Sequence, residues 1–235
     1  MHKPIDTSAV ILAGGLGTRL RSVVQDRPKI LAEILGRPYI TYLFDQLLNA
    51  GIYNVILCTG YMSQLVYDAL GVAYKTLKIQ YSEEESPLGT GGALRKALPL
   101  ISSDPVLVMN GDSFIKVDLR QYISWFFYIK RNIAIMLTHV KNAARYGKVL
   151  ISENGELLSF QEKDIDNTPG WINAGIYLIK KDQILMIPEN SNISLEKQIF
   201  PALIGKKFYG FLQNSNFIDI GTPESYQQAQ LFFKK

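Results

Sequence analysis

Apolar and polar positions alternate along the first half of the chain in units that predict strands and helices in turn. Short apolar runs predict buried strands at residues 9–12, 55–58, 77–81 and 106–109. Between them, helices are predicted at residues 38–51, where apolar positions at helical spacing end at a glycine, at 62–70, and after Gly92. Strands that alternate with helices predict an α/β fold with a mostly parallel central sheet and helices on both faces.

The second half of the chain shows a different pattern, which predicts mixed strands. These are expected at residues 133–139, 148–151, 157–161 and 174–179. Asn154-Gly155 predicts a hairpin turn, and residues 223–233 predict a closing helix with Thr222 as its cap and Pro223 at its first position. No break in composition separates the halves, so residues 1–235 are predicted to form one domain with lobes at 1–112 and 113–235.

The most informative motif follows directly on the first predicted strand. Residues 12–20 read Leu-Ala-Gly-Gly-Leu-Gly-Thr-Arg-Leu and are followed by Pro28-Lys29. Glycines without Cβ atoms let backbone N–H groups approach an anion, and Arg19 and Lys29 add two cations near the same loop. The loop therefore favours a nucleoside triphosphate as ligand, although a glycine cluster by itself is also typical of a tight turn with no ligand.

Two commoner glycine motifs do not fit these residues. A P-loop needs Gly-Lys-Ser/Thr at its end, whereas Gly17 is followed by Thr18-Arg19. The dinucleotide fingerprint needs a third glycine where Leu20 stands and an acidic residue after the second strand, where the chain has Cys58-Thr59-Gly60. A Walker NTPase and an NAD or FAD enzyme are both disfavoured.

The glycine motif with its following Pro-Lys resembles the signature of the sugar-phosphate nucleotidyltransferases, and the resemblance spans nearly the whole chain. Further matching segments are residues 84–92, Asn110-Gly111-Asp112, residues 160–163, Asn173-Ala174-Gly175 and residues 219–223. The resemblance implies a Rossmann-like, glycosyltransferase-A-like sheet with a nucleotide-binding lobe at 1–112 and a sugar-phosphate-binding lobe at 113–235. Residues 19–24, Arg-Leu-Arg-Ser-Val-Val, depart from the more usual Arg-Leu-x-Pro-Leu-Thr and resemble the bacterial D-glycero-α-D-manno-heptose 1-phosphate guanylyltransferases.

What the resemblance implies is transfer of a nucleotidyl group, GMP from GTP by preference, to a sugar 1-phosphate, with release of pyrophosphate. D-glycero-α-D-manno-heptose 1-phosphate is the favoured acceptor; mannose 1-phosphate and a uridylyl or thymidylyl transferase are alternatives. A nucleotide-sugar-sensing regulatory subunit is the non-enzyme alternative, and it would be expected to lose Arg19, Lys29, Asp112 or Asp219, all of which are present. A glycosyltransferase is disfavoured because Asp112-Ser113-Phe114 lacks the second aspartate of an Asp-x-Asp motif.

The resemblance also implies roles for individual residues. The implied catalytic residues are Arg19, Lys29 and Asp112. The implied nucleotide-binding residues are Leu12, Ala13, Gly14, Gly15, Gly17, Thr18, Glu84 and Gly89. The implied sugar-phosphate-binding residues are Gly147, Glu162, Lys163 and Asn173. Asp112 and Asp219 are the implied ligands of Mg²⁺, a cation that takes one or two protein carboxylates and keeps several waters; alone, each aspartate would more simply be a turn or helix cap.

The predicted choice of base depends on Glu84. Guanine presents two adjacent donors, N1–H and the 2-amino group, and a carboxylate is an acceptor-only group that can take both. Glu84 therefore favours guanine, while family members that use thymidine or uridine nucleotides commonly have glutamine three positions before the matching proline. Charge alone allows a simpler interpretation, in which residues 83–85 are a solvated acidic run.

Composition adds limits to this interpretation. With 47% hydrophobic residues in 235, the chain can bury a substantial core, and its formal charge of +4 is scattered, which disfavours a nucleic-acid-binding surface. No apolar run predicts a signal peptide or a membrane helix, so a cytoplasmic enzyme is expected, and the lone Cys58 is predicted to pack as a small hydrophobe. Four adjacent aromatics at residues 125–128 cannot all face inward on one helix, so part of this cluster is a candidate subunit interface of a homo-oligomer.

Overall fold

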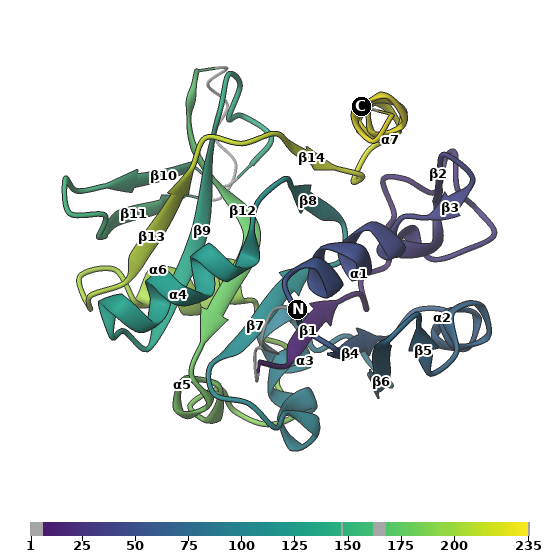
Figure 1. Cartoon of the computed structure of the whole chain (residues 1–235), viewed down its shortest axis with the longest axis horizontal. Coiled ribbons are helices and arrows are strands. Elements are labelled where there is room, and N and C mark those ends of the chain that lie inside the picture. The colour runs from purple at the N-terminus through teal and green to yellow at the C-terminus, as the bar shows by residue number, and fades with distance from the viewer. Residues whose placement is uncertain (1–6, 147, 162–167, 235) are drawn as a thin grey trace.

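One large mixed sheet organises the molecule (Figure 1). The computed structural model describes residues 7–146, 148–161 and 168–234, and within them this sheet has ten strands. They are β1 (Ala9–Leu12), β4 (Asn54–Thr59), β5 (Ala73–Tyr74), β6 (Leu77–Glu83), β7 (Val106–Asn110), β9 (Ile133–Val140), β10 (Lys148–Ile151), β11 (Leu157–Gln161), β12 (Gly170–Ile179) and β13 (Tyr209–Gln213). The order is β11-β10-β12-β7-β1-β4-β6-β5, with β9 pairing β12 and β13.

The parallel part of the sheet comes from the first half of the chain. β1 pairs in parallel with both β4 and β7, and β4 pairs in parallel with β6. The second half contributes antiparallel pairs, of β12 with β7, β9 and β10, and of β10 with β11. The predicted α/β fold with mixed strands in the C-terminal half is confirmed, and so is the hairpin at Asn154-Gly155, where Gly155 has a φ of +83°.

Helices cover both faces of the sheet because its central strands are apolar on both sides. In β1, Ala9 and Ile11 belong to one buried cluster and Val10 belongs to the other. The first cluster includes side chains of α1 (Ile40–Asn49), α2 (Ser63–Leu70), α4 (Leu119–Ile129) and α7 (Pro223–Phe232). The second includes side chains of α3 (Gly89–Ala97), α5 (Lys181–Leu185), the π-helical turn Leu195–Ile199 and α6 (Phe200–Ala202).

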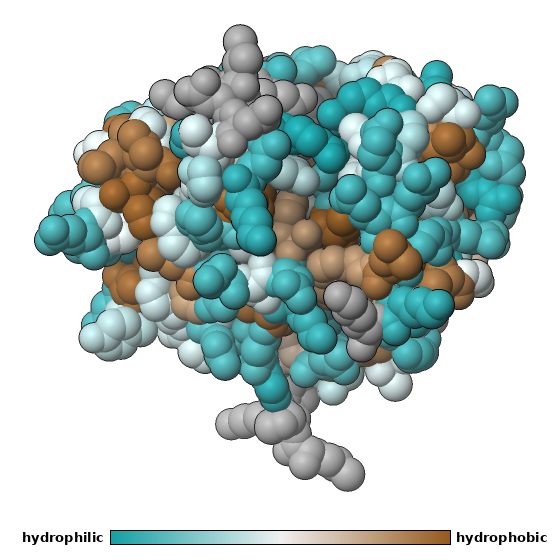
Figure 2. Space-filling model, turned by 90° about the horizontal axis from the view of Figure 1, so that it is seen from above, coloured by the Kyte–Doolittle hydropathy of each residue, from teal (hydrophilic) through white to brown (hydrophobic). Residues whose placement is uncertain are grey.

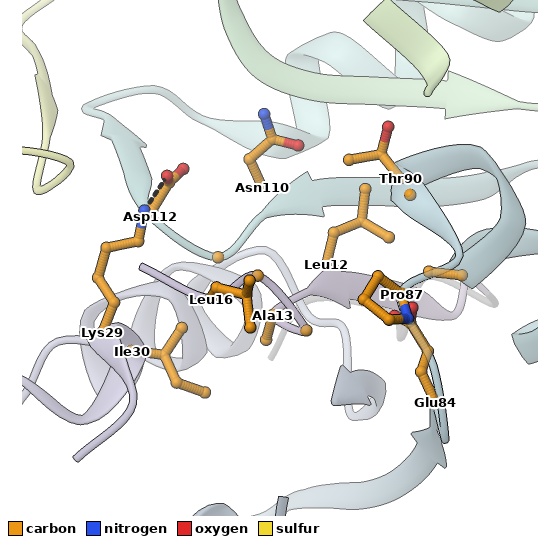
Figure 3. Close-up of a pocket in the computed structure, with 15 residues that line it drawn as sticks. Leu12, Ala13, Leu16, Lys29, Ile30, Glu84, Pro87, Thr90, Asn110 and Asp112 are labelled. Atoms are coloured by element: carbon orange, nitrogen blue, oxygen red, sulfur yellow. Dashed lines mark hydrogen bonds and ion pairs between the residues drawn. The ribbon is translucent and has the colours of Figure 1, made fainter. Parts of the chain in front are cut away.

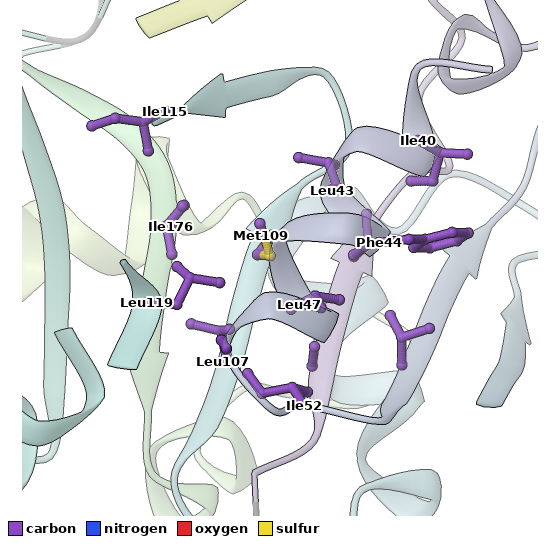
Figure 4. Packing of buried hydrophobic residues seen from close by; sticks show 14 of the residues in the cluster. Ile40, Leu43, Phe44, Leu47, Ile52, Leu107, Met109, Ile115, Leu119 and Ile176 are labelled. Atoms are coloured by element: carbon purple, nitrogen blue, oxygen red, sulfur yellow. The ribbon is translucent and has the colours of Figure 1, made fainter. Parts of the chain in front are cut away.

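Helix α1 lies across the centre of the sheet, as its apolar spacing predicts (Figure 4). Leu43, Phe44 and Leu47 are fully buried and lie in one cluster with Leu107 and Met109 of β7. Burying a side chain of this size contributes on the order of 1.5–3 kcal/mol, so this face of α1 fixes the helix against the strands that carry the site.

Helix α3 begins earlier than the sequence predicts, at Gly89 instead of after Gly92. Its glycines are needed for a close approach to the segment before the π-helical turn. A Cβ at Gly92 would lie 2.3 Å from the carbonyl oxygen of Ser191, and the N–H of Gly91 donates to the carbonyl of Ile193 at 2.7 Å. Glycines that look like helix breakers in the sequence therefore lie inside the helix, because their missing side chains leave room for another backbone.

Two short strand pairs lie outside the large sheet and were not predicted. β2 (Glu33–Ile34) pairs with β3 (Arg37–Pro38), and β8 (Ser113–Ile115) pairs with β14 (Phe217–Asp219). The chain after β14 enters α7 through Thr222, whose hydroxyl accepts from the N–H of Ser225 in a capping box, as the sequence predicts. The β8–β14 pair matters for function, because it carries Asp219 to the end of β7.

The surface and the remaining side chains agree with two expectations from the sequence. Phe126 is buried in α4, whereas Phe127 and Tyr128 are 54% and 84% exposed, so the aromatic cluster does divide between core and surface. Cys58 is buried, and burial raises the pKa of its thiol, as expected for a packing residue. None of the helices in the described part of the chain has the length and apolarity that a membrane span requires.

Candidate functional site

The carboxyl ends of β1 and β7 border a cavity of about 280 Å³, called here the first cavity. In an open α/β sheet a crevice forms beyond the strand ends where the connections turn in opposite directions, and here β1 leads to β4 on one side while β7 lies on the other. Seen from above, the surface is hollowed near its middle, where hydrophobic surface is set back between hydrophilic side chains (Figure 2). The cavity is lined by Leu12, Ala13, Gly14, Gly15, Leu16, Lys29, Ile30, Glu84, Pro87, Gly89, Thr90, Ala93, Asn110, Gly111 and Asp112.

Glycines in the lining allow close contacts that any side chain would prevent. A Cβ at Gly14 would lie 2.6 Å from Oε1 of Glu84, and a Cβ at Gly111 would lie 2.8 Å from the carbonyl oxygen of Leu12. Gly17 has a φ of +60°, which an L-residue rarely adopts, whereas a Cβ at Gly15 would meet open space. The loop thus keeps its backbone exposed to the cavity, as a ligand held by N–H groups requires.

Glu84 is fixed at one end of the first cavity by its own backbone and by its neighbours. Its N–H donates to the carbonyl of Thr59 at 2.8 Å, and its Oε2 accepts from the N–H of Leu88 at 2.8 Å. Burial raises the pKa of the carboxyl group, and the Leu88 hydrogen bond opposes that rise. Its side chain is therefore a positioned acceptor at the cavity wall and not part of a freely solvated acidic run.

The opposite end of the first cavity carries an ion pair. Lys29, the first residue of a 3-10 turn that follows Pro28, donates from Nζ to Oδ2 of Asp112. Figure 3 shows this pair at one end of the cavity and Glu84 with Pro87 at the other, with Leu12 and Ala13 between them. The cavity is therefore polar at both ends and largely apolar along its floor, a shape suited to a planar ring and a charged group joined by a spacer.

Asp219 lies close to Asp112 because of the β8–β14 pair. Asp219 is opposite Ser113 in that register, and the N–H of Ile220 donates to the carbonyl of Asp112 at 2.9 Å. Both oxygens of Asp219 are engaged: Oδ1 accepts from the N–H of Gly221 at 2.8 Å, and Oδ2 accepts from Tyr146 at 2.8 Å and from Arg145 at 3.3 Å.

Two carboxylates in this position fit the needs of a magnesium ion, which takes hard oxygen ligands, few of them from protein, and completes its shell with water and phosphate. Each carboxylate has a cationic partner, Lys29 for Asp112 and Arg145 for Asp219. Among the described residues no group of three or more acidic, histidine or cysteine side chains could hold a metal by itself. The donor set therefore suits a metal that arrives with a phosphate ligand.

A second cavity of about 180 Å³ opens beside the first. It is lined by Arg19, Asn110, Asp112, Ser113, Arg145, Tyr146, Phe160, Asn173, Gly175, Glu196, Phe217 and Asp219. Asn110 and Asp112 line both cavities, so the end of β7 is their common wall. β12 brings Asn173 to this wall, and its bulge at Gly175 needs a glycine, since φ is +75° and a Cβ would lie 2.5 Å from Oγ of Ser113.

The predicted site residues divide between the two cavities. Leu12, Ala13, Gly14, Gly15, Lys29, Glu84, Gly89 and Asp112 line the first cavity, while Arg19, Asn173, Asp219 and again Asp112 line the second. Gly17 lines a small hollow beside Arg21 and Tyr61, and Thr18 lines none of these spaces. Gly147, Glu162 and Lys163 lie outside the described residues. Arg19 and Lys29 were both expected to contact the triphosphate, but they lie in the linings of different cavities.

The lining residues to which the sequence analysis gave no role include Thr90, Arg145, Tyr146 and Glu196. Arg145 and Tyr146 hold Asp219, and Glu196 accepts hydrogen bonds from Thr90 at 2.7 Å and from Tyr177 at 3.1 Å. The sequence offers little that would single these residues out. Glu196 lies in a short segment without a motif, two positions after the capping Ser194, and the pattern around Arg145-Tyr146 is typical of a solvated loop. Apart from the contact of Glu196 with Tyr177, these contacts join residues more than 70 positions apart in the chain.

Comparisons with known proteins find similar sequences and structures over nearly the whole chain. A family model described as nucleotidyl transferase matches residues 8–235. The D-glycero-alpha-D-manno-heptose 1-phosphate guanylyltransferase of Aneurinibacillus thermoaerophilus is 39% identical over 94% of this chain and 96% of its own length. The mannose-1-phosphate guanylyltransferase of Mycobacterium tuberculosis is 34% identical over 93% of this chain and 62% of its own length. The crystal structure of HddC from Yersinia pseudotuberculosis complexed with GMP-PN has a TM-score of 0.85 and 33% identity, and the match covers 97% of this chain and 99% of that one.

The contact at Gly89 gives a test of how the first cavity is built. A Cβ at Gly89 would lie 2.6 Å from the carbonyl oxygen of Ile193, and Gly89 has a φ of +68°. Gly36→Ala is the matched control, because Gly36 has a φ of +76° but open space around it. Strain should cost about 1–2 kcal/mol in both variants, and Gly89→Ala should lose a further 1 kcal/mol or more of unfolding free energy in urea denaturation. Equal losses would show that the approach to Ile193 is not required.

Proposed function

We propose, from the premise that this chain belongs to the nucleotidyl transferase family, that it transfers GMP from GTP to D-glycero-α-D-manno-heptose 1-phosphate and releases pyrophosphate. One observation carries the proposal: the two cavities share the end of β7, with Asp112 in the lining of both. A reaction between two phosphate-bearing substrates needs two sites whose phosphate ends meet. The common wall at Asp112 provides that meeting point.

The first cavity suits GTP. The guanine ring fits the end at Glu84, where the carboxylate accepts from N1–H and the 2-amino group. The triphosphate then extends along the glycine loop toward Lys29, at the opposite end of the cavity (Figure 3). The HddC structure with GMP-PN, a guanine nucleotide analogue by its title, supports this choice of base in a relative of nearly the same length.

The second cavity suits the sugar 1-phosphate. Asn173 provides an amide for sugar hydroxyls, and Arg19 provides a guanidinium for phosphate oxygens. We assign Gly147, Glu162 and Lys163 to the same substrate from the family resemblance. Heptose is preferred over mannose because the heptose 1-phosphate relative matches over 96% of its own length, whereas the mannose 1-phosphate relative has a further part that this chain does not match.

The chemistry requires little covalent participation by the protein. An oxygen of the sugar phosphate attacks the α-phosphorus of GTP, a new phosphorus–oxygen bond forms, and the bond from the α-phosphorus to the bridging oxygen of pyrophosphate breaks in line. Catalysis then depends on holding the two phosphates in line and on cations that offset the charge of three crowded anionic groups. We assign Lys29, which lines the first cavity, to neutralise the triphosphate; Arg19, which lines the second cavity, is assigned to the acceptor phosphate instead of the triphosphate.

Asp112 and Asp219 are the residues we assign to Mg²⁺. When bound, the ion would supply positive charge that lowers the repulsion between the two substrates. Lys29 is paired with Asp112 and Arg145 with Asp219, so each carboxylate that would hold the ion lies beside a cation able to contact phosphate oxygens.

Pyrophosphate release from purified protein with Mg²⁺ tests the proposed function. GTP, UTP, dTTP, CTP and ATP are each combined with heptose, mannose and glucose 1-phosphates. A signal that is strongest with GTP and the manno-heptose is expected. A signal confined to mannose 1-phosphate would change the assigned acceptor, and silence with retained GTP binding would favour a nucleotide-sugar sensor.

Asp112→Asn should reduce turnover by roughly 100- to 1000-fold or more, because it removes a negative charge where both substrates and the metal meet. The control is Asp68→Asn, which removes an exposed carboxylate of α2 whose partner is Gln64. Steady-state turnover with GTP and the acceptor is measured beside thermal unfolding, so that loss of fold is distinguished from loss of chemistry. Near-native turnover in Asp112→Asn would remove the metal assignment.

Glu84→Gln should weaken GTP relative to UTP by about 1–3 kcal/mol, since a half-buried charged acceptor is replaced by an amide that cannot accept both guanine donors. Glu85→Gln is the control, because it makes the same change in an exposed neighbour. Affinities for GTP and UTP are compared by titration calorimetry. The pKa of Glu84 is raised, so GTP affinity of the wild type should fall as pH drops through that pKa, and this loss should vanish in Glu84→Gln. An unchanged base preference would contradict the assignment.

A further inference from the structure

A chain of hydrogen bonds joins the two cavities through Glu196. Its Oε1 accepts from the hydroxyl of Tyr177 at 3.1 Å, and its Oε2 accepts from Thr90 at 2.7 Å and from Ser194 at 3.0 Å. Thr90 lines the first cavity and belongs to the first turn of α3, whereas Glu196 lines the second cavity from the π-helical turn. Three hydroxyl groups from three segments therefore converge on one carboxylate.

The hydroxyl of Tyr177 is the centre of this network. Its oxygen accepts a hydrogen bond from Nδ2 of Asn173 at 2.9 Å and a longer one from Nδ2 of Asn110 at 3.4 Å. Asn173 lines the second cavity, and Asn110 lines both. The network thus ends on two amides that face the proposed substrates.

The carboxylate fixes the direction of every bond in the network. An ionised carboxylate can only accept, so Tyr177 gives its single hydrogen to Glu196. Its oxygen must then accept from its other neighbours, which turns the Nδ2 groups of both asparagines toward it and their carbonyl oxygens away. An asparagine can ordinarily be placed with its amide either way round. Here Glu196, acting through Tyr177, selects the orientation of Asn110, and it selects that of Asn173 together with the N–H of Gly175.

The two carbonyl oxygens that result have different surroundings. Oδ1 of Asn173 accepts from the N–H of Gly175 at 2.8 Å, which holds the amide in the bulge of β12. Oδ1 of Asn110 is buried and has no hydrogen-bond partner among the described residues. A buried carbonyl without a partner is unfavourable, so the junction of the cavities holds an acceptor that a hydroxyl group of a substrate would satisfy.

Tyr177 keeps the hydrogen that the network needs. Burial raises the pKa of its hydroxyl well above the ordinary 10.0, and the neighbouring carboxylate of Glu196 raises it further. Its ring is fully buried against Phe200, so the hydroxyl cannot turn toward solvent. The direction of the bonds is therefore the same throughout the working range of pH.

We propose that Glu196 is a positioning residue that orients the amides of Asn173 and Asn110 through Tyr177 for recognition of sugar hydroxyls, and that it ties this arrangement to the first turn of α3 through Thr90. The inference rests on the proposed function, since it assigns the acceptor to the second cavity. Glu196 acts without touching the reacting phosphates. Its effect belongs to acceptor recognition more than to the chemical step.

Glu196→Gln tests the proposal because glutamine has the same shape and one fewer acceptor. If the amide nitrogen faces Tyr177, it donates to the hydroxyl, whose hydrogen must turn toward an asparagine and displace that amide. This orientation is favoured, because it leaves the glutamine oxygen facing Thr90 and Ser194, from which it still accepts two hydrogen bonds. The hydrogen bonds around Tyr177 are then disturbed, so binding of the acceptor is lost in part while the packing stays the same.

We expect the KM for the sugar 1-phosphate to rise roughly tenfold or more in Glu196→Gln, the scale of one substrate hydrogen bond, with kcat at saturating acceptor and the Kd for GTP each within about threefold of wild type. The matched control is Glu153→Gln, which neutralises an exposed carboxylate remote from both cavity linings. Steady-state kinetics, GTP calorimetry and thermal unfolding are measured for each protein.

A coupling measurement separates orientation from general structural support. Asn173→Ala should raise the acceptor KM strongly in the wild type and much less in Glu196→Gln, because the hydrogen bond from this amide to Tyr177 is already disturbed there. Tyr177→Phe, which keeps the buried ring and removes only the hydroxyl, should reproduce the rise in KM and serves if Glu196→Gln folds poorly. Additive effects, or a fall in kcat and thermal stability with an unchanged KM, would overturn the proposal. If the wild-type protein releases no pyrophosphate with any substrate pair, the result would instead refute the proposed function itself.

Discussion

The antiparallel pairing of β12 with β7 is the constraint on which the rest of the site depends. β7 also pairs in parallel with β1. Its carboxyl end therefore has a parallel strand on one side and an antiparallel strand on the other. The glycine loop after β1 opens one cavity, the bulge of β12 opens the other, and Asn110 and Asp112 line both. Two phosphate-bearing substrates can then meet at a fixed wall of one sheet, which provides the positioning that an in-line displacement needs.

Charge balance at this wall follows from the same arrangement. Two partly buried carboxylates close together repel each other and are costly unless each has a partner. The chain provides one cation for each, Lys29 from the turn after the glycine loop and Arg145 from the loop before β10. Both cations thus lie at the wall where the proposed function brings the two phosphates together. The opposite charges of this wall are paired with each other in the structure.

The sequence predicts the parts of the site that local pattern determines. The strand followed by a glycine loop, the helix at α1 and the cap at Thr222 follow from short-range spacing, and Glu84 could be singled out because its segment carries a motif. The early start of α3, the β8–β14 pair and the contacts of Glu196 could not be predicted. They depend on where the segment around Ile193 and the strand that ends at Asp219 pack. Contacts between residues far apart in the chain produce no periodic pattern of apolar positions in the sequence.

The direction of a hydrogen bond carries information that distance alone does not. Sugars that differ in one hydroxyl group present similar shapes, and a site distinguishes them by requiring a donor or an acceptor at a given point. A network fixed by Glu196 can impose that requirement on the ring hydroxyls through Asn173 and Asn110. Mannose and the manno-heptose share their ring and differ in the exocyclic chain, so this network cannot separate them. Their discrimination must come from other side chains of the second cavity, and recognition of the ring and of its extension are therefore separable properties of the site.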